Sequence, residues 1–200
     1  MTTTSFSDKS LPLQKETPKE WVKCVLADFK TFLLDHASCE RKAAALAMSF
    51  VAKYPNRTFL IEPMVSLARE EMEHFAQVYR LIGKQGMVYD SFDEKDTYVR
   101  SMLSQLRHGR DERFLDRLIV SGLIEARGWE RFHMLSQELT EPSIKEFYQT
   151  LSKQELGHYK IFINMAHKYF SKEEVSKTIE RLAHLESQAM LESPISARLH

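Results

Sequence analysis

Apolar side chains recur at alternating steps of three and four residues along four long stretches of the sequence. Such spacing places them on one face of an α-helix, so we predict four long helices, over residues 18–54, 58–84, 111–139 and 142–169. A short helix is predicted over residues 95–106. A final helix is expected from the capping box Ser171-Lys172-Glu173-Glu174 to about Leu191, and a similar box at Thr17-Pro18-Lys19-Glu20 is expected to begin the first long helix.

The breaks between these stretches predict how the helices are connected. Pro55-Asn56 and Thr140-Glu141-Pro142 are turn sequences, so the long helices form two hairpins, over residues 18–84 and 111–169. A helix of about 27 residues is about 40 Å long, and the connector of about 26 residues between the hairpins can run that length. One long crossover between two helix hairpins is the ferritin-like arrangement.

We therefore predict an all-α fold: a ferritin-like four-helix bundle with a short crossover helix and an extra C-terminal helix. The scarcity of glycine and proline, with six of each, agrees with long helices joined by short turns. The domain is expected over residues 18–191, with a flexible N-terminal arm over residues 1–17 and a loose tail over residues 192–200.

Six polar residues interrupt the apolar faces of the long helices. Each hairpin contributes two glutamates and one histidine: Glu40, Glu71 and His74 in the first, and Glu125, Glu155 and His158 in the second. In each hairpin one glutamate lies about 14 residues before the turn and the other about 13 residues into the next helix, so antiparallel helices bring them to one level. The Glu-x-x-His spacing then places each histidine on the same face as its glutamate.

This repeated set of residues predicts a metal centre. Four buried carboxylates would not all stay ionised without positive charge, because burial and mutual repulsion both favour protonation. Two divalent cations would balance them, and oxygen with imidazole nitrogen suits iron or manganese better than zinc. Because this set is also the di-metal pattern of helical bundles, we predict two iron ions, with manganese as an alternative. The competing interpretation is a structural ion-pair network.

Other polar residues near these six are interpreted as structural or surface residues rather than as metal ligands. A third Glu-x-x-His, from Glu130 to His133, has no counterpart in the other half and is interpreted as a surface pair. His36, one turn before the first of the six, is interpreted as a core residue or a neighbour of the ligands rather than a ligand. Tyr159 is interpreted as a packing residue, with a radical role as the less favoured alternative.

Composition narrows the classes of function. The 28 basic residues balance the 28 acidic residues, so overall charge does not indicate nucleic-acid binding, although a local basic patch is compatible with it. Cys24 and Cys39 fit neither a disulfide framework nor a zinc motif and are interpreted as reduced thiols. The N-terminus lacks an apolar signal segment, and no run reaches the roughly 18 apolar residues of a membrane span. We expect a soluble cytoplasmic protein with no membrane partner.

Three segments of the chain resemble one enzyme family. They are His36-Ala37-Ser38-Cys39-Glu40-Arg41-Lys42-Ala43-Ala44, Leu67-Ala68-Arg69-Glu70-Glu71-Met72-Glu73-His74-Phe75 and Leu123-Ile124-Glu125-Ala126-Arg127. Over roughly residues 18–195 the chain is similar to the tRNA 2-methylthio-isopentenyladenosine hydroxylase (MiaE) family of the ferritin-like diiron superfamily. The resemblance implies an O₂-dependent monooxygenase that hydroxylates the isopentenyl group of a modified adenosine next to the tRNA anticodon.

The resemblance also implies roles for the six predicted ligands: terminal ligation by Glu40 and Glu125, bridging of the irons by Glu71 and Glu155, and ligation of one iron each by His74 and His158. Two ferrous ions would together supply two electrons to O₂. Since no flavin or nicotinamide motif is visible, an external electron-transfer reductase is the implied partner that restores them. The other implied partner is the prenylated, methylthiolated tRNA.

Two basic clusters are candidates for contacts with tRNA phosphates. One comprises Arg107, His108, Arg110, Arg113 and Arg117, and the other comprises Arg41, Lys42, Lys53 and Arg57. Asp111, Glu112 and Asp116 dilute the first cluster, and either cluster is also compatible with an ordinary solvated face. Two other functions compete: a different ferritin-like diiron oxidase, peroxidase or ferroxidase that does not act on tRNA, and a metal-free helical interaction protein.

Overall fold

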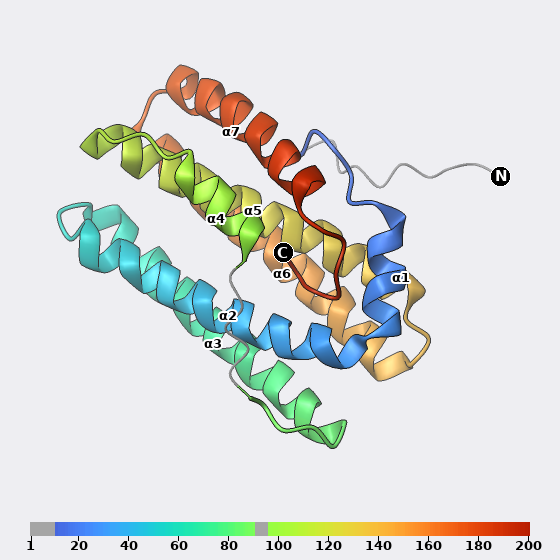
Figure 1. Cartoon of the computed structure of the whole chain (residues 1–200). Helices are drawn as coiled ribbons and strands as arrows, with labels where there is room; N and C mark the ends of the chain where they lie inside the picture. The colour runs from blue at the N-terminus through green and yellow to red at the C-terminus, as the bar shows by residue number, and fades with distance from the viewer. Residues whose placement is uncertain (1–10, 91–95) are drawn as a thin grey trace. The chain divides into compact units, whose positions relative to one another are not determined.

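The computed structural model describes residues 11–90 and 96–200 of the chain (Figure 1). Within these residues it contains seven helices and no strand. The helices are α1 Lys19–Ala27, α2 Phe29–Lys53, α3 Thr58–Lys84, α4 Thr97–Ser104, α5 Arg110–Glu138, α6 Pro142–Tyr169 and α7 Lys172–Glu192. The predicted ranges 58–84, 111–139 and 142–169 agree with α3, α5 and α6 to within one residue at each end. The predicted all-helical architecture is therefore confirmed at the level of its elements.

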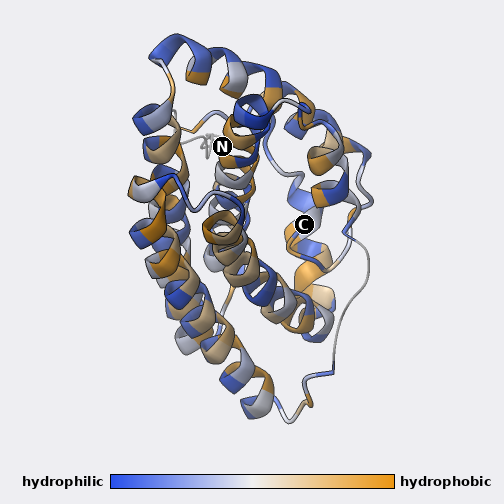
Figure 2. Cartoon of the chain, turned by 90° about the vertical axis from the view of Figure 1, so that its left-hand side faces the viewer, coloured by the Kyte–Doolittle hydropathy of each residue, from blue (hydrophilic) through white to orange (hydrophobic). Residues whose placement is uncertain are grey.

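The described chain divides into two units according to its internal contacts. The α2–α3 unit contains residues 23–90 and 196–199, and the α5–α6 unit contains residues 11–22, 96–195 and 200. Each unit is built on one of the two predicted helix hairpins. Figure 2 shows apolar and polar residues alternating along the helices, as expected of helices with one buried and one exposed face.

The first hairpin packs α2 along α3, and its core consists of fully buried apolar side chains, among them Phe32, Leu33, Phe50, Leu60 and Val78. Tyr54 and Pro55 end α2 where the sequence predicts a turn. At the other end of α3, Gly86 has a φ of 68°, which favours glycine. The N–H of Met87 donates to the carbonyl of Ile82 at 3.2 Å, a bond typical of a glycine-terminated helix.

The predicted first long helix, over residues 18–54, is wrong in one respect, because it breaks at Asp28. Asp28 leaves the helical conformation with φ −137° and ψ 60°, and its side chain accepts a hydrogen bond from the N–H of Thr31 at 3.2 Å. An aspartate that caps the N-terminus of a new helix competes with continuation of the old one. The apolar periodicity runs across the break, and therefore hides it.

The second hairpin packs α5 along α6, and α7 and α4 also pack against α5. Gly122 of α5 faces α6, since a Cβ at this position would lie 3.4 Å from the Cβ of Phe162, an ordinary van der Waals contact. The predicted capping box of the last helix is confirmed: the hydroxyl of Ser171 accepts from the N–H of Glu174, and the Glu174 carboxylate accepts from the N–H of Ser171.

The predicted capping box at Thr17 does not form, because its threonine bonds elsewhere. The hydroxyl and the N–H of Thr17 donate to the carboxylate of Glu130 on α5, at 2.6 Å and 3.1 Å. Thr17 is buried, with 3% of its surface exposed. The residues just before α1 therefore make specific contacts with α5.

The C-terminal residues of the chain also make specific contacts. Leu199 is buried, and its N–H donates to the carboxylate of Asp35 on α2 at 2.8 Å. Ala197 is buried as well, and the ring of His200 stacks on Tyr98 of α4 with 5.5 Å between centroids. These contacts differ from the loose tail expected over residues 192–200.

Candidate metal centre

The α2–α3 unit buries three of the six predicted ligands close together. Glu40 projects from α2, and Glu71 and His74 project from α3, each with 3% or less of its surface exposed. The Nδ1 atom of His74 lies 3.4 Å from a carboxylate oxygen of Glu71 and 3.7 Å from one of Glu40. The three side chains therefore form one half-site with two carboxylates and one imidazole.

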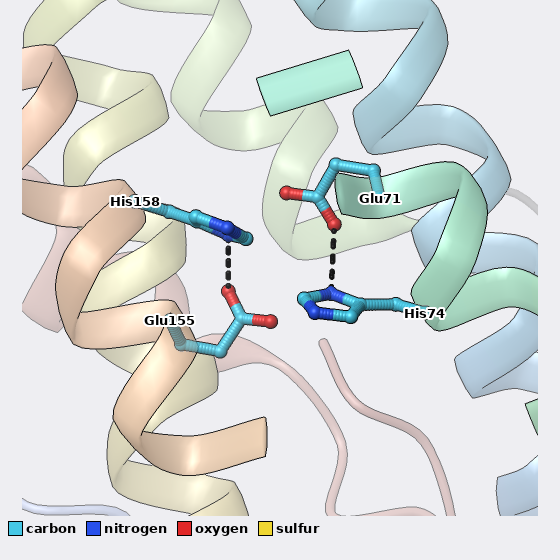
Figure 3. Close-up of side chains that lie close together, drawn as sticks. All are labelled: Glu71, His74, Glu155 and His158. Atoms are coloured by element: carbon cyan, nitrogen blue, oxygen red, sulfur yellow. Dashed lines mark ion pairs between the residues drawn. The ribbon is translucent and has the colours of Figure 1, made fainter. Parts of the chain in front are cut away.

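The α5–α6 unit buries the other three predicted ligands. Glu155 and His158 lie one helical turn apart on α6, and the Nδ1 atom of His158 is 3.3 Å from a carboxylate oxygen of Glu155. Glu125 is buried on the neighbouring helix α5, with 8% of its surface exposed. Figure 3 draws the Glu71–His74 pair and the Glu155–His158 pair, and in each the carboxylate turns toward the imidazole of its own helix.

The chemistry of these side chains fits a bound divalent metal. Burying a carboxylate is costly unless a positive charge or several hydrogen bonds compensate it. Glu71, His74, Glu155 and His158 each offer a buried ligand atom. Oxygen and imidazole nitrogen without thiolate suit iron and manganese. The two half-sites lie in different units of the chain, and the joining of their ligands around one pair of metals stays a prediction.

Comparison with known proteins gives the family of the chain. The family model described as "tRNA-(MS[2]IO[6]A)-hydroxylase (MiaE)" matches residues 4–200. The chain belongs to the MiaE family. A curated relative from Pseudomonas putida, named tRNA 2-(methylsulfanyl)-N(6)-isopentenyladenosine(37) hydroxylase, is 35% identical over 89% of this chain and 85% of its own length. A relative of the same name from Salmonella typhimurium is 26% identical over 92% of this chain and 85% of its own length.

A solved structure supports the fold of this MiaE-family chain. It is described as "Protein 43 with aldehyde deformylating oxygenase activity from Synechococcus" and is 34% identical. It covers 95% of this chain and 96% of its own, with a TM-score of 0.89. The predicted fold class, an all-α ferritin-like bundle, is thereby confirmed, as is the predicted family.

The third Glu-x-x-His of this MiaE-family chain is not the surface pair that the sequence suggests. Glu130 is buried and accepts hydrogen bonds from Arg127 as well as Thr17. His133 is half-buried and stacks on Trp129, with 5.6 Å between ring centroids, and burial lowers its pKa. Glu130 and His133 therefore serve separate structural contacts.

Three other polar residues close in sequence to the proposed ligands are at least half-buried and have the following contacts. His36 is fully buried, and its Nε2 atom lies 2.6 Å from Glu40. Cys39 is half-buried and directs its thiol to Asp35 at 3.8 Å. Tyr159 is buried, and burial raises the pKa of its hydroxyl, so the phenol stays protonated at neutral pH.

The basic cluster around the start of α5, called here the α5 cluster, is partly neutralised. Arg107 donates to Asp116 through its side chain and its backbone N–H, and Arg181 of α7 donates to the same carboxylate at 2.7 Å. Arg117 is buried. The exposed members are therefore fewer than the sequence suggests. The residues of this cluster are Arg107, His108, Arg110, Arg113 and Arg117.

The second basic cluster, called here the α2 cluster, lies on α2 and the turn that follows it. Arg41 and Lys53 are exposed, and Lys42 and Arg57 are half-buried. Arg41 directly follows Glu40, so this cluster begins beside a predicted metal ligand. In the part of the chain that the structure describes, no helix is long and apolar enough to cross a membrane.

Proposed function

We propose that this MiaE-family protein is an O₂-dependent tRNA hydroxylase. Its substrate is the 2-methylthio-isopentenyladenosine next to the anticodon, and the isopentenyl group receives the hydroxyl. The family match over residues 4–200 supports this activity, as do the names of the two curated relatives. The proposed tRNA substrate implies a cytoplasmic enzyme.

The buried, duplicated Glu-x-x-His pair is the observation that carries the oxygen chemistry. In this proposal the six residues would hold two iron ions: Glu40 and Glu125 would each serve one iron, Glu71 and Glu155 would be shared by the two irons, and His74 and His158 would each serve one iron. Manganese fits the same donors and is the alternative metal. When bound, two ferrous ions supply two of the electrons that O₂ needs to hydroxylate an allylic C–H bond of the isopentenyl group.

The polypeptide supplies geometry and exclusion of water. Each proposed ligand is fixed on a long helix by the apolar core of its hairpin, so the donor atoms are held before metal arrives. All six side chains are at least nine-tenths buried, which limits access of water to the reaction. The electrons used in each turnover would come from an external reductase.

For the tRNA surface we favour the α2 cluster over the α5 cluster. Asp116 pairs with both Arg107 and Arg181 and neutralises one of their two charges, whereas Arg41 and Lys53 are exposed on the helix that carries Glu40. Arg41 directly follows the proposed ligand Glu40, and cations on this helix can bind anticodon-loop phosphates without reading sequence. In this proposal the modified base, rather than the phosphate contacts, determines which nucleoside reacts.

The deciding experiment is hydroxylation of prenylated, methylthiolated tRNA by the iron-loaded protein. Reduced protein is mixed with O₂ and this tRNA, the tRNA is digested, and the nucleosides are analysed by mass. A gain of one oxygen atom on the modified adenosine is expected with the wild type and not with Glu71→Ala. Glu73→Ala, which removes an exposed carboxylate on the same helix, is the matched control and should retain the activity.

Parallel reactions separate the competing oxidase functions. The same iron-loaded protein is supplied with hydrogen peroxide, with excess ferrous ion or with a long-chain aldehyde, the last because the similar solved structure is named for an aldehyde deformylating activity. Fast turnover of any of these substrates, together with no gain of oxygen by the tRNA nucleosides in the first assay, would overturn the proposal. That result would favour a diiron oxidase that does not act on tRNA.

A further inference from the structure

His36 is in direct contact with one of the proposed metal ligands. It lies on α2 one helical turn before Glu40, and no part of its side chain is exposed. Its Nε2 atom is 2.6 Å from Oε1 of Glu40. Because an ionised carboxylate can only accept, His36 donates its Nε2–H to that oxygen.

The two oxygens of Glu40 therefore have different neighbours. Oε1 accepts the hydrogen bond of His36, while Oε2 lies 3.7 Å from Nδ1 of His74. A carboxylate held in this way directs Oε2 toward the other donors of the half-site, while Oε1 is engaged in the hydrogen bond with His36. Rotation of the carboxylate would break the bond to His36, and binding of one metal by both oxygens would require Oε1 to serve the imidazole and the metal at once.

We propose that His36 is a positioning residue that makes Glu40 a one-oxygen ligand of its metal. This inference rests on the proposed function only in taking Glu40 as a metal ligand. Groups that hydrogen-bond to metal ligands orient them, and their removal commonly lowers metal affinity about 10-fold to 100-fold.

The ring of His36 is itself held in place. Phe32, one turn earlier on α2, packs against it with 5.8 Å between ring centroids and 33° between the ring planes. The donor is thus fixed before metal binds. A histidine that only filled space would be replaceable by an apolar side chain of similar size, and the hydrogen-bond donor would not matter.

The chain contains an internal comparison for this role. In the second hairpin, the residue one turn before Glu125 is Ser121, which is also buried but has a shorter side chain that ends in a hydroxyl. The repeat of the six ligands thus does not extend to their neighbour on the preceding turn. We infer that the two metal positions are inequivalent, and that the position at Glu40 is the one sensitive to residue 36.

Four variants of the full chain test the inference. His36→Leu removes the donor and keeps apolar volume, and His36→Gln keeps an N–H at similar reach from the backbone. His36→Asn keeps an amide that is too short to reach Glu40 in the same way. Ser121→Ala alters the matching position of the other hairpin.

Metal affinity is measured by titrating Co²⁺ into each metal-free variant in competition with a chelator, and the two iron environments are compared by Mössbauer spectroscopy of protein loaded with ⁵⁷Fe. We expect the wild type to bind two ions per chain. His36→Leu and His36→Asn should bind one of them about 10-fold to 100-fold more weakly. One of the two iron signals should change with them, and His36→Gln should restore most of the affinity. Ser121→Ala should leave the signal that depends on residue 36 unchanged.

The outcomes separate this inference from the proposed function. A wild type that binds no Co²⁺ or iron would overturn the metal centre itself. Two ions in the wild type, with the same affinity and the same spectra in His36→Leu and His36→Asn, would overturn the role of His36 alone. If circular dichroism shows that His36→Leu does not fold, the comparison of His36→Gln with His36→Asn decides, because both side chains are polar amides that differ in reach.

Discussion

Arg127 on α5 holds Glu186 on α7 through two nitrogen atoms. Its Nε and Nη2 atoms donate to the two carboxylate oxygens at 2.8 Å and 2.9 Å, and neither side chain is exposed to solvent. Arg127 also donates to Glu130, and the hydroxyl of Tyr98 donates to Glu186 at 2.9 Å. The network joins α4, α5 and α7 within the α5–α6 unit.

Removing Arg127 should destabilise the protein strongly. Arg127→Met fills the space but leaves Glu130 and Glu186 buried without their main cation, which typically costs about 3–5 kcal/mol. Tyr98→Phe removes one neutral donor to Glu186 and should cost about 1–2 kcal/mol. Urea unfolding followed by circular dichroism at neutral pH measures both free energies of unfolding.

Lys177→Ala is the control for that series. Lys177 pairs with Glu173 at 2.6 Å, but about three-quarters of each side chain is exposed. Exposed pairs contribute about 0.5 kcal/mol or less. A loss of stability in Arg127→Met no larger than that of Lys177→Ala would show that the buried network does not stabilise the fold.

Asp116 should make the stability depend on acid pH. Burial alone would raise the pKa of Asp116, but hydrogen bonds from Arg107 and Arg181 outweigh it and lower the pKa below its ordinary value of 3.8. A lowered pKa stabilises the folded state above the ordinary value, and that stabilisation is lost as the pH falls through the folded-state pKa. Asp116→Asn should therefore be less stable than the wild type at pH about 7, by about 1–3 kcal/mol. The difference should shrink steadily below pH about 4.

Unfolding in urea across this pH range measures the difference. Asp111→Asn, which alters an exposed carboxylate in the first turn of the same helix, is the comparison. A deficit of Asp116→Asn that is constant from neutral to strongly acid pH would mean that the ionised carboxylate is not the source of the stability.

The sequence predicts most of the helices because burial follows their 3.6-residue period, and it predicts the six candidate ligands because they are polar where that period demands apolar residues. Glu186 shows the limit of this rule. It too lies on a buried stripe, between Leu182 and Met190, yet its partner is an arginine. Spacing identifies a buried charge but does not say whether a metal or a side chain balances it.

Two of the features that the sequence predicts wrongly involve a polar residue with two possible hydrogen-bond partners. Asp28 can continue a helix or cap a new one, and it caps. Thr17 has a good local capping sequence, yet bonds Glu130, which is 113 positions away. Such choices depend on long-range packing, which local sequence does not contain.

Replacing a proposed ligand should affect metal binding and stability in opposite directions. In the metal-free protein, Glu71 is a buried carboxylate in the same half-site as the buried carboxylate of Glu40, so Glu71→Gln should raise the free energy of unfolding by about 1 kcal/mol or more. The same variant should lose metal, because a neutral amide is a poorer bridging ligand. Thermal unfolding with and without added Fe²⁺ under anaerobic conditions measures both effects.

Glu155→Gln should behave like Glu71→Gln, since it is the matching residue of the other hairpin. Glu73→Gln, on the exposed side of α3, should change neither property. Ligand variants that lower the stability of the metal-free protein and still bind two ions would contradict the proposed centre.

The α2 cluster should contribute more to tRNA binding than the α5 cluster. Arg41→Ala with Lys53→Ala should weaken binding of an anticodon stem-loop whether or not its adenosine is modified, because phosphate contacts carry no sequence information. The dependence of log Kd on log salt should become shallower by about one for each phosphate that the variant no longer neutralises. Fluorescence anisotropy between about 50 and about 200 mM salt measures this slope.

Arg110→Ala with Arg113→Ala removes equal charge from the α5 cluster and is the matched control. If the control lowers the slope and the α2 variant does not, the tRNA surface lies at the start of α5, and the neutralising effect assigned to Asp116 is too small to decide the binding face.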